Sequence, residues 1–217
     1  MSKINEISKR SKEEILNALE FGIKYELKEK ASDPSVHIKQ SENPLEETMQ
    51  KMQENKFEVH LVESKEQVID EINKISAIYN AKSLIYPSSL SVDVEKVNAE
   101  KKVCFNKEIE ELRKEVFHSD FSIIDVDFAL SSHGVACVTS SKTQPRMLSL
   151  APTLCIMLLD KTKIETSLAS GLEKISKENE VLPTNILYIA GPSRTSDIEL
   201  VTVFGVHGSQ KVHIIFY

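Results

Sequence analysis

FEVHLVESKEQVIDEINKISAIYNAKSLIYP, residues 57–87, decides the fold class. Two short apolar runs, FEVHLV and SLIYP, flank the segment EQVIDEINKISAIYN, in which apolar residues recur at helical spacing. A strand, a helix and a second strand in this order are typical of two parallel strands joined by a crossover helix. The stretch therefore predicts an α/β protein with an open, largely parallel sheet flanked by helices.

The same alternation continues to the carboxyl end of the chain. Helices are predicted over residues 106–118 and 167–176 and from about Ser196. Strands are predicted over residues 103–105, 122–130, 134–140, 154–160, 185–190 and 211–217. The sheet should therefore run through most of the chain.

The first 40 residues read differently from the rest. SKEEILNALEFG, residues 11–22, has one apolar helical face, and the polar stretch ASDPSVHIKQSENP carries two prolines. Asn43 and Pro44 then stand at the favoured positions for starting the next helix. We expect an N-terminal helix and linker arm over residues 1–40 and one compact domain over residues 41–217.

Composition narrows the range of functions. The formal net charge is -6 over 217 residues, which argues against a general nucleic-acid binder, since phosphate binding requires an excess of clustered Lys and Arg. No apolar run approaches the length of a membrane span, and the N-terminus does not resemble a signal peptide, so we expect a cytoplasmic protein. Cys104, Cys137 and Cys155 lie far apart in apolar contexts, which indicates core thiols rather than metal or cluster ligands.

Residues 128–159 contain no Asp or Glu although the chain is acidic. His133, Lys142 and Arg146 stand there among several Ser and Thr residues. Such a group suits a small carboxylate or phosphate, because Arg offers a bidentate fork and Lys a mobile charge. The alternative is an exposed polar loop with ordinary surface cations.

GPSRTSDIE, residues 191–199, follows a strand-like apolar run and supplies a second candidate site. Ser193, Thr195 or Ser196 could cap a helix, and Asp197 would favour the positive end of its dipole. Arg194 would oppose that dipole, so it needs compensation from a bound anion, from a nearby carboxylate such as Asp197, or from solvent. The stretch is therefore either an anion-binding loop or a capped helix start.

A third candidate is the turn GVHG, residues 205–208, where two glycines surround His207. His207 and His133 each stand beside a glycine, and neither has a second ligand at metal-binding spacing. Both could contact a ligand, or both could be hydrogen-bonded structural histidines. The common nucleotide and nucleophile motifs are absent from the sequence.

These segments together resemble the LUD domain of the lactate-utilization protein C family. The specific matches are GPSRT-x-DIE, the G-V-H-G turn and the final V-H strand, which occur in that order, together with P-R-x-L-S-L-x-P at residues 145–152. The resemblance runs from about residue 40 to the end of the chain. The helix SKEEILNAL also looks like the N-terminal helix of the family.

The resemblance implies a fold like that of the NagB/RpiA/CoA-transferase group. It also implies a bacterial role beside two iron–sulfur partner proteins, LutA- and LutB-like, in oxidising L-lactate to pyruvate. Arg146, Ser193, Arg194, Thr195, Asp197 and His207 stand at the motif positions as candidates for ligand binding. We expect no cofactor on this chain, with the iron–sulfur clusters in the partners.

One segment departs from the family pattern. Members usually show I-A-x-T-G-T/S, whereas residues 130–135 read LSSHGV. Gly134 is kept, but His133 replaces the Thr and Val135 replaces the following hydroxyl residue. The change suggests an altered ligand at this loop, or a divergent paralogue with another substrate.

Three hypotheses for function follow. The first is an accessory subunit of an iron–sulfur lactate oxidation system, which binds a small anion or a partner without its own redox cofactor. The second is a stand-alone acyl- or phosphosugar-handling transferase or isomerase, and the third is a non-catalytic ligand sensor. For the first we expect Arg146 and Arg194 to converge on one cleft at the carboxyl edge of the sheet.

Overall fold

The structure is a computed structural model that describes residues 10–18, 41–196, 202–205 and 207–217. The chain divides into two units, residues 1–34 and 35–217. In the first unit, residues 10–18 are helical. In the part of the chain that is described, no helix combines the length and the apolar character needed to cross a membrane.

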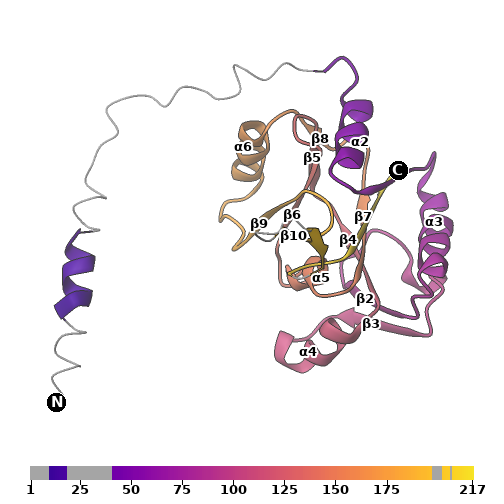
Figure 1. Cartoon of the computed structure of the whole chain (residues 1–217), viewed down its shortest axis with the longest axis horizontal. Coiled ribbons are helices and arrows are strands. Elements are labelled where there is room, and N and C mark those ends of the chain that lie inside the picture. Colours follow the sequence, from indigo (N-terminus) through magenta and orange to yellow (C-terminus); the bar gives the residue numbers. More distant parts are fainter. Residues whose placement is uncertain (1–9, 19–40, 197–201, 206) are drawn as a thin grey trace. The chain divides into compact units, whose positions relative to one another are not determined.

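A six-stranded parallel sheet forms the centre of the second unit (Figure 1). Its order is β1-β12-β7-β4-β2-β3, and every neighbouring pair is parallel. The strands are β1 (Glu58–Leu61), β2 (Ser83–Pro87), β3 (Lys101–Phe105), β4 (Phe121–Asp125), β7 (Leu154–Leu159) and β12 (Lys211–Phe216). The predicted α/β class and parallel sheet are confirmed.

Helices connect these strands and cover the sheet, as the crossover pattern requires. They are α2 (Pro44–Glu54), α3 (Lys65–Ile78), α4 (Ile109–His118), the short α5 (Met147–Leu150) and α6 (Leu168–Glu178), with a 3-10 turn η2 (Val94–Lys96). At the start of α2 the Asn43 side chain accepts a hydrogen bond from the backbone N–H of Glu46, and Pro44 is the first helical residue. This start agrees with the sequence prediction.

Each face of the sheet carries its own hydrophobic cluster. All six residues of β7 are buried, because this central strand has covered faces on both sides. The cluster on the α3 face includes Val68, Ile72 and Ile75 of that helix. The opposite cluster includes Met52 of α2, Val116 of α4 and Leu148 of α5.

A second sheet was not expected from the sequence. Its order is β8-β5-β6-β9, and β6 runs antiparallel to both neighbours. The strands are β5 (Phe128–Leu130), β6 (Val135–Thr139), β8 (Ile164–Glu165) and β9 (Ile186–Ile189). The single strand predicted over residues 122–130 is in fact two strands, because the chain leaves the parallel sheet at Val126 and Asp127. The Asp127 carboxylate fixes this break by accepting a hydrogen bond from the backbone N–H of Thr139 at 2.6 Å.

The prediction of a helix from about Ser196 is wrong, because the described residues before and after residues 197–201 form strands. Arg194–Ser196 form β10 and Thr202–Phe204 form β11, which pair antiparallel. Thr, Val and Phe dominate β11, and such residues favour the extended backbone. The cap-like residues of GPSRTSDIE therefore lead into a β-ribbon rather than a helix, and Asp197 lies outside the described residues.

Candidate functional site

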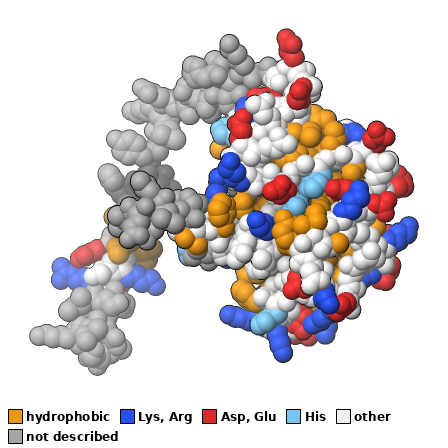
Figure 2. Space-filling view, turned by 45° about the vertical axis from the view of Figure 1, so that its right-hand side comes forward, with side chains coloured by type: hydrophobic (Ala, Val, Ile, Leu, Met, Phe, Trp, Pro, Cys, Tyr) orange, Lys and Arg blue, Asp and Glu red, His pale blue; other side chains and the backbone are white. Residues whose placement is uncertain are grey.

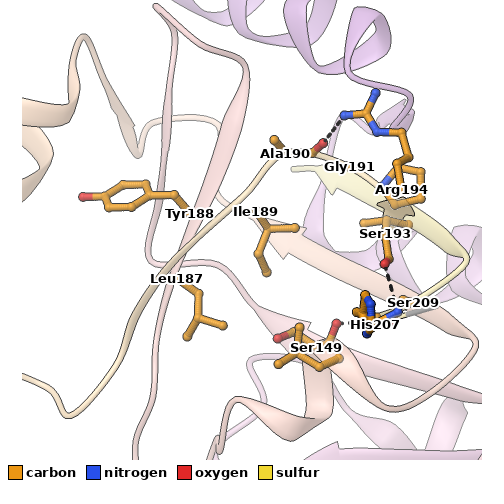
Figure 3. A pocket seen from close by; sticks show the side chains of 14 residues that line it. Ser149, Leu187, Tyr188, Ile189, Ala190, Gly191, Ser193, Arg194, His207 and Ser209 are labelled. Carbon is orange, nitrogen blue, oxygen red and sulfur yellow. Dashed lines mark hydrogen bonds between the residues drawn. The ribbon is translucent and has the colours of Figure 1, made fainter. Parts of the chain in front are cut away.

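A pocket of about 490 Å³ lies where the segment after β9 meets the turn before β12 (Figure 3). Its volume falls within the range of small-molecule sites, about 300–1,000 Å³. Its lining comes from α5, from β9 and the turn that follows it, and from the start of β12, and consists of Ser149, Leu150, Leu187, Tyr188, Ile189, Ala190, Gly191, Pro192, Ser193, Arg194, His207, Gly208, Ser209 and Val212. The pocket thus contains three of the predicted site residues, Ser193, Arg194 and His207.

Ser193 joins the two segments of the pocket. Its backbone N–H donates to the carbonyl of Ser209 at 2.9 Å, and its own carbonyl accepts from the N–H of Gly205 at 3.0 Å. Its hydroxyl oxygen accepts from the backbone N–H of His207 at 3.3 Å. The hydroxyl hydrogen of Ser193 is then free of this bond and can point to a ligand.

Two buried serines on the other side of the pocket hold backbone carbonyls. Ser209 Oγ donates to the carbonyl of Pro152 at 2.7 Å, with the Ser149 carbonyl 3.2 Å away. Ser149 Oγ donates to the carbonyl of Arg146 at 2.8 Å. The Ser209 hydroxyl thus fixes the α5 segment against the start of β12, whereas the Ser149 hydroxyl bonds within the α5 segment itself. Neither serine was among the predicted site residues, although each stands inside or beside one of the family motifs.

Glycines allow the backbone to approach closely at two points of the pocket. Gly191 has φ of +88°, and a Cβ there would lie 2.1 Å from the Asn55 carbonyl oxygen at the end of α2. A Cβ on Gly208 would lie 3.2 Å from the Ser193 Cβ. Larger side chains at these positions would push the two motif segments away from their supports.

Arg194 provides the positive charge of the pocket. Its exposed guanidinium donates from Nη2 to the carbonyl of Ala190 at 3.0 Å, so the side chain folds back over the turn at Gly191 (Figure 3). Its remaining donors can bind a carboxylate or phosphate. Arg194 is the only Lys or Arg among the described residues that line the pocket, and none of those residues is Asp or Glu.

The pocket is at the opposite edge of the sheet from the one expected. Ser209 lies two positions before β12 and α5 precedes β7, so the pocket borders the amino-terminal ends of these parallel strands. Arg146 does not belong to its lining; its Nη1 donates to Asn185 Oδ1 at 3.2 Å. The expected convergence of Arg146 and Arg194 on a cleft at the carboxyl edge is therefore wrong.

His133 and Lys142 are also apart from this pocket and from each other, at opposite ends of β6. His133 Nδ1 lies 2.6 Å from Ser132 Oγ, and the Asn55 side-chain amide donates to the carbonyls of His133 and Gly134 at 2.8 and 2.9 Å. Gly134 has φ of +60°, a backbone conformation that favours glycine. Lys142 is exposed.

The acid-free composition of residues 128–159 has a structural cause. The strands β5, β6 and β7 make up a large part of the range, and β5 and β7 are buried throughout. Buried strands exclude unpaired carboxylates because their desolvation is costly.

Thr195, another predicted site residue, is half-buried in β10 next to Arg194. In the ranges that the structure describes, His, Cys, Asp and Glu side chains do not form a group of three that could hold a metal ion.

Tyr188 lines the pocket, but its side chain points away from Ser193 and Arg194 (Figure 3). Its ring packs with Cys137 in the cluster under α6, and its buried hydroxyl has no hydrogen-bond partner among the described residues. Burial, and then the neighbouring Cys137 thiol, raises the pKa of Tyr188 to about 12. Tyr188 therefore stays neutral at physiological pH and serves the core.

The chain is similar to several known proteins. Residues 45–217 match the family described as the LUD domain. Lactate utilization protein C of Bacillus subtilis is 35% identical over 105 residues, which cover 47% of this chain and 44% of that protein. The uncharacterized protein YkgG of Escherichia coli is 35% identical over 92 residues, which cover 41% of this chain and 40% of that protein. In these comparisons the chain spans less than half of each relative's length.

A solved structure shows the same fold. The crystal structure of a DUF162 family protein from Deinococcus radiodurans matches with a TM-score of 0.59 and 19% identity, and the match covers 80% of this chain and 95% of that chain. The family match covers the parallel sheet, the second sheet and both segments of the pocket. The chain belongs to the LUD domain family.

Proposed function

We propose that this chain serves in lactate utilization as an accessory component that binds a small carboxylate in the Ser193–Arg194–His207 pocket. The relatives named lactate utilization protein C support the physiological role. The observation that carries the site is the joining of two motif segments, Gly191–Arg194 and His207–Ser209, around one cation.

The chemistry of the pocket fits a carboxylate of the size of lactate. Arg194 can form two parallel hydrogen bonds to a carboxylate, and the Ser193 hydroxyl can donate to a second oxygen. Apolar side chains such as Leu150, Ile189 and Val212 complete the lining. These would cover the short carbon chain of a hydroxy or keto acid, while Arg194 would set its orientation.

The redox step is assigned to partner proteins that carry iron–sulfur clusters. In this account the chain contributes ligand binding and a docking surface, and it holds no cofactor of its own. The resemblance to lactate-utilization proteins supports this division of roles. The partners would be the LutA- and LutB-like proteins of the same cell.

A deletion experiment tests the physiological role. The gene for this chain is removed from its own organism, and growth is compared on L-lactate and on pyruvate as sole carbon source. We expect loss of growth on L-lactate, normal growth on pyruvate, and recovery with the wild-type gene but not with Arg194→Ala. Undiminished growth on L-lactate would overturn the role, whereas full rescue by Arg194→Ala would overturn only the assignment of the pocket.

A further inference from the structure

A chain of hydrogen-bonded side chains connects α3 with the edge of the parallel sheet, away from the pocket. Glu71 Oε1 of α3 lies 2.8 Å from His60 Nδ1 of β1, and His60 Nε2 lies 2.9 Å from His213 Nδ1 of β12. His213 Nε2 lies 2.9 Å from the Tyr79 hydroxyl at the end of α3. The two imidazole rings stack with their centroids 5.2 Å apart.

The four side chains are largely shielded from water. His213 is buried, with 4% of its surface exposed, and the other three are half-buried. Figure 2, which brings the α3 side forward, shows histidine on this face among hydrophobic and charged side chains. The charged groups in or near this row of four side chains are Glu71 and Lys74 from α3, Glu58 from β1 and Lys211 from β12.

The position of each hydrogen follows from Glu71. Burial alone would raise the pKa of Glu71, but the hydrogen bond and charge of Lys74, and then His60, hold it below its ordinary value. Glu71 is therefore an acceptor, and His60 Nδ1 must carry a hydrogen. If His60 is neutral, its Nε2 accepts from His213 Nδ1, and His213 Nε2 accepts from the Tyr79 hydroxyl. Each hydrogen of these three hydrogen bonds then points towards Glu71.

One additional proton can enter without breaking any of these contacts. It arrives at the half-buried Tyr79 oxygen, and the hydroxyl hydrogen of Tyr79 moves to His213 Nε2. The hydrogen on His213 Nδ1 moves to His60 Nε2. His60 becomes an imidazolium beside the Glu71 carboxylate, His213 stays neutral in its other tautomer, and Tyr79 changes from donor to acceptor.

We propose that Glu71, His60, His213 and Tyr79 form a proton relay that binds a single proton on His60 and thereby reverses the two hydrogen bonds made by His213. A second proton is strongly disfavoured, because it would place two imidazolium rings in stacking contact. In agreement, burial, followed by the charges of His60 and Lys211, lowers the pKa of His213 to about 4. The junction of β1, β12 and α3 is thus a pH-sensitive element built into the fold.

Nitrogen-15 NMR of the histidine rings in the full chain tests the relay. Nitrogen shifts and ring couplings distinguish the two neutral tautomers from imidazolium, and the chain has only six histidines to assign. From pH 8 to pH 5 we expect His60 to become imidazolium while His213 changes from the Nδ1–H to the Nε2–H tautomer. Both changes should share one midpoint. A tautomer of His213 that does not change, or His213 taking the first proton, would overturn the proposal.

Glu71→Gln supplies a second test, because the glutamine side chain can still accept a hydrogen bond from His60 Nδ1 but carries no charge. The midpoint should move down by about one pH unit or more, the scale of a lost neighbouring carboxylate. Glu66→Gln, at an exposed position of the same helix, is the matched control and should leave the midpoint unchanged. Equal midpoints in wild type and Glu71→Gln would contradict the relay. If Glu71→Gln does not fold, the tautomer measurement on the wild type decides alone.

Discussion

Ser193 and His207 are held together by a hydrogen bond from the His207 backbone N–H to Ser193 Oγ, 3.3 Å long. The two residues are 14 positions apart and flank the β10–β11 ribbon. This bond links the two motif segments that line the pocket, and the exposed Arg194 lies beside it in the lining. The pocket's geometry therefore depends on a few backbone contacts, which single substitutions can test.

Gly191→Ala should destabilise the protein more than Gly205→Ala. Both glycines have positive φ, so alanine adds backbone strain of about 1–2 kcal/mol at either position. At Gly191 the new Cβ would also collide with the Asn55 carbonyl, whereas at Gly205 it meets the side chain of Gln210, which can move. Urea denaturation checks the order. Equal losses of unfolding free energy would mean that α2 yields at Asn55 and does not fix the turn.

Tyr188→Phe should leave the unfolding free energy unchanged or raise it by up to about 1 kcal/mol. The hydroxyl is buried without a described hydrogen-bond partner, so its removal abolishes a desolvation cost. Tyr79→Phe is the matched control and should lose about 1 kcal/mol, since its hydroxyl bonds His213. A large loss in Tyr188→Phe would show that this hydroxyl has a partner, such as a buried water.

One cysteine of three should react in the native protein. Cys137 and Cys155 are fully buried, and burial raises the pKa of each thiol to about 12, which leaves almost no thiolate at pH 8. Cys104 is only half-buried. Titration with a thiol reagent should give about one fast equivalent, and three after denaturation. Two or three fast equivalents in the native state would contradict the packing around β6 and β7.

The stability of the protein should fall in mild acid because of His213. Its pKa is about 4 in the folded chain, against an ordinary value of 6.5. Between these values the unfolded chain binds more protons, so the contribution is complete above pH 6.5 and is lost as the pH falls towards 4. The shift corresponds to about 3 kcal/mol. Unfolding free energies measured from pH 7 to 4 should decline less in His213→Gln, and parallel curves would refute the assignment.

The sequence predicted the parallel sheet well because its strands carry local signals. β2 and β7 are short apolar runs between turn residues, and α3 has a clear helical repeat. The break at Val126 and Asp127 was not predicted, although Asp125 and Asp127 interrupt the apolar run there. What fixes it is a contact between Asp127 and Thr139, which depends on the second sheet.

The site was predictable only in part for the same reason. The motifs placed Ser193, Arg194 and His207 on a shared list, and the structure brings these three together. Arg146 stood on that list because of the motif at residues 145–152 and the acid-free composition of residues 128–159, but its side chain bonds Asn185 and does not line the pocket. The hydrogen-bonded pair His60 and His213 had no sequence signal, because contacts between neighbouring strands 153 residues apart are set by topology.

The central claim, that Arg194 binds a carboxylate in this pocket, is tested most directly by calorimetric titration with L-lactate and pyruvate. Wild type and Arg146→Ala should bind with equal affinity, because Arg146 does not line the pocket. Arg194→Ala should bind weaker by about 1.5–3 kcal/mol, roughly tenfold to more than a hundredfold. Unchanged affinity in Arg194→Ala, or loss of binding in Arg146→Ala alone, would contradict the account.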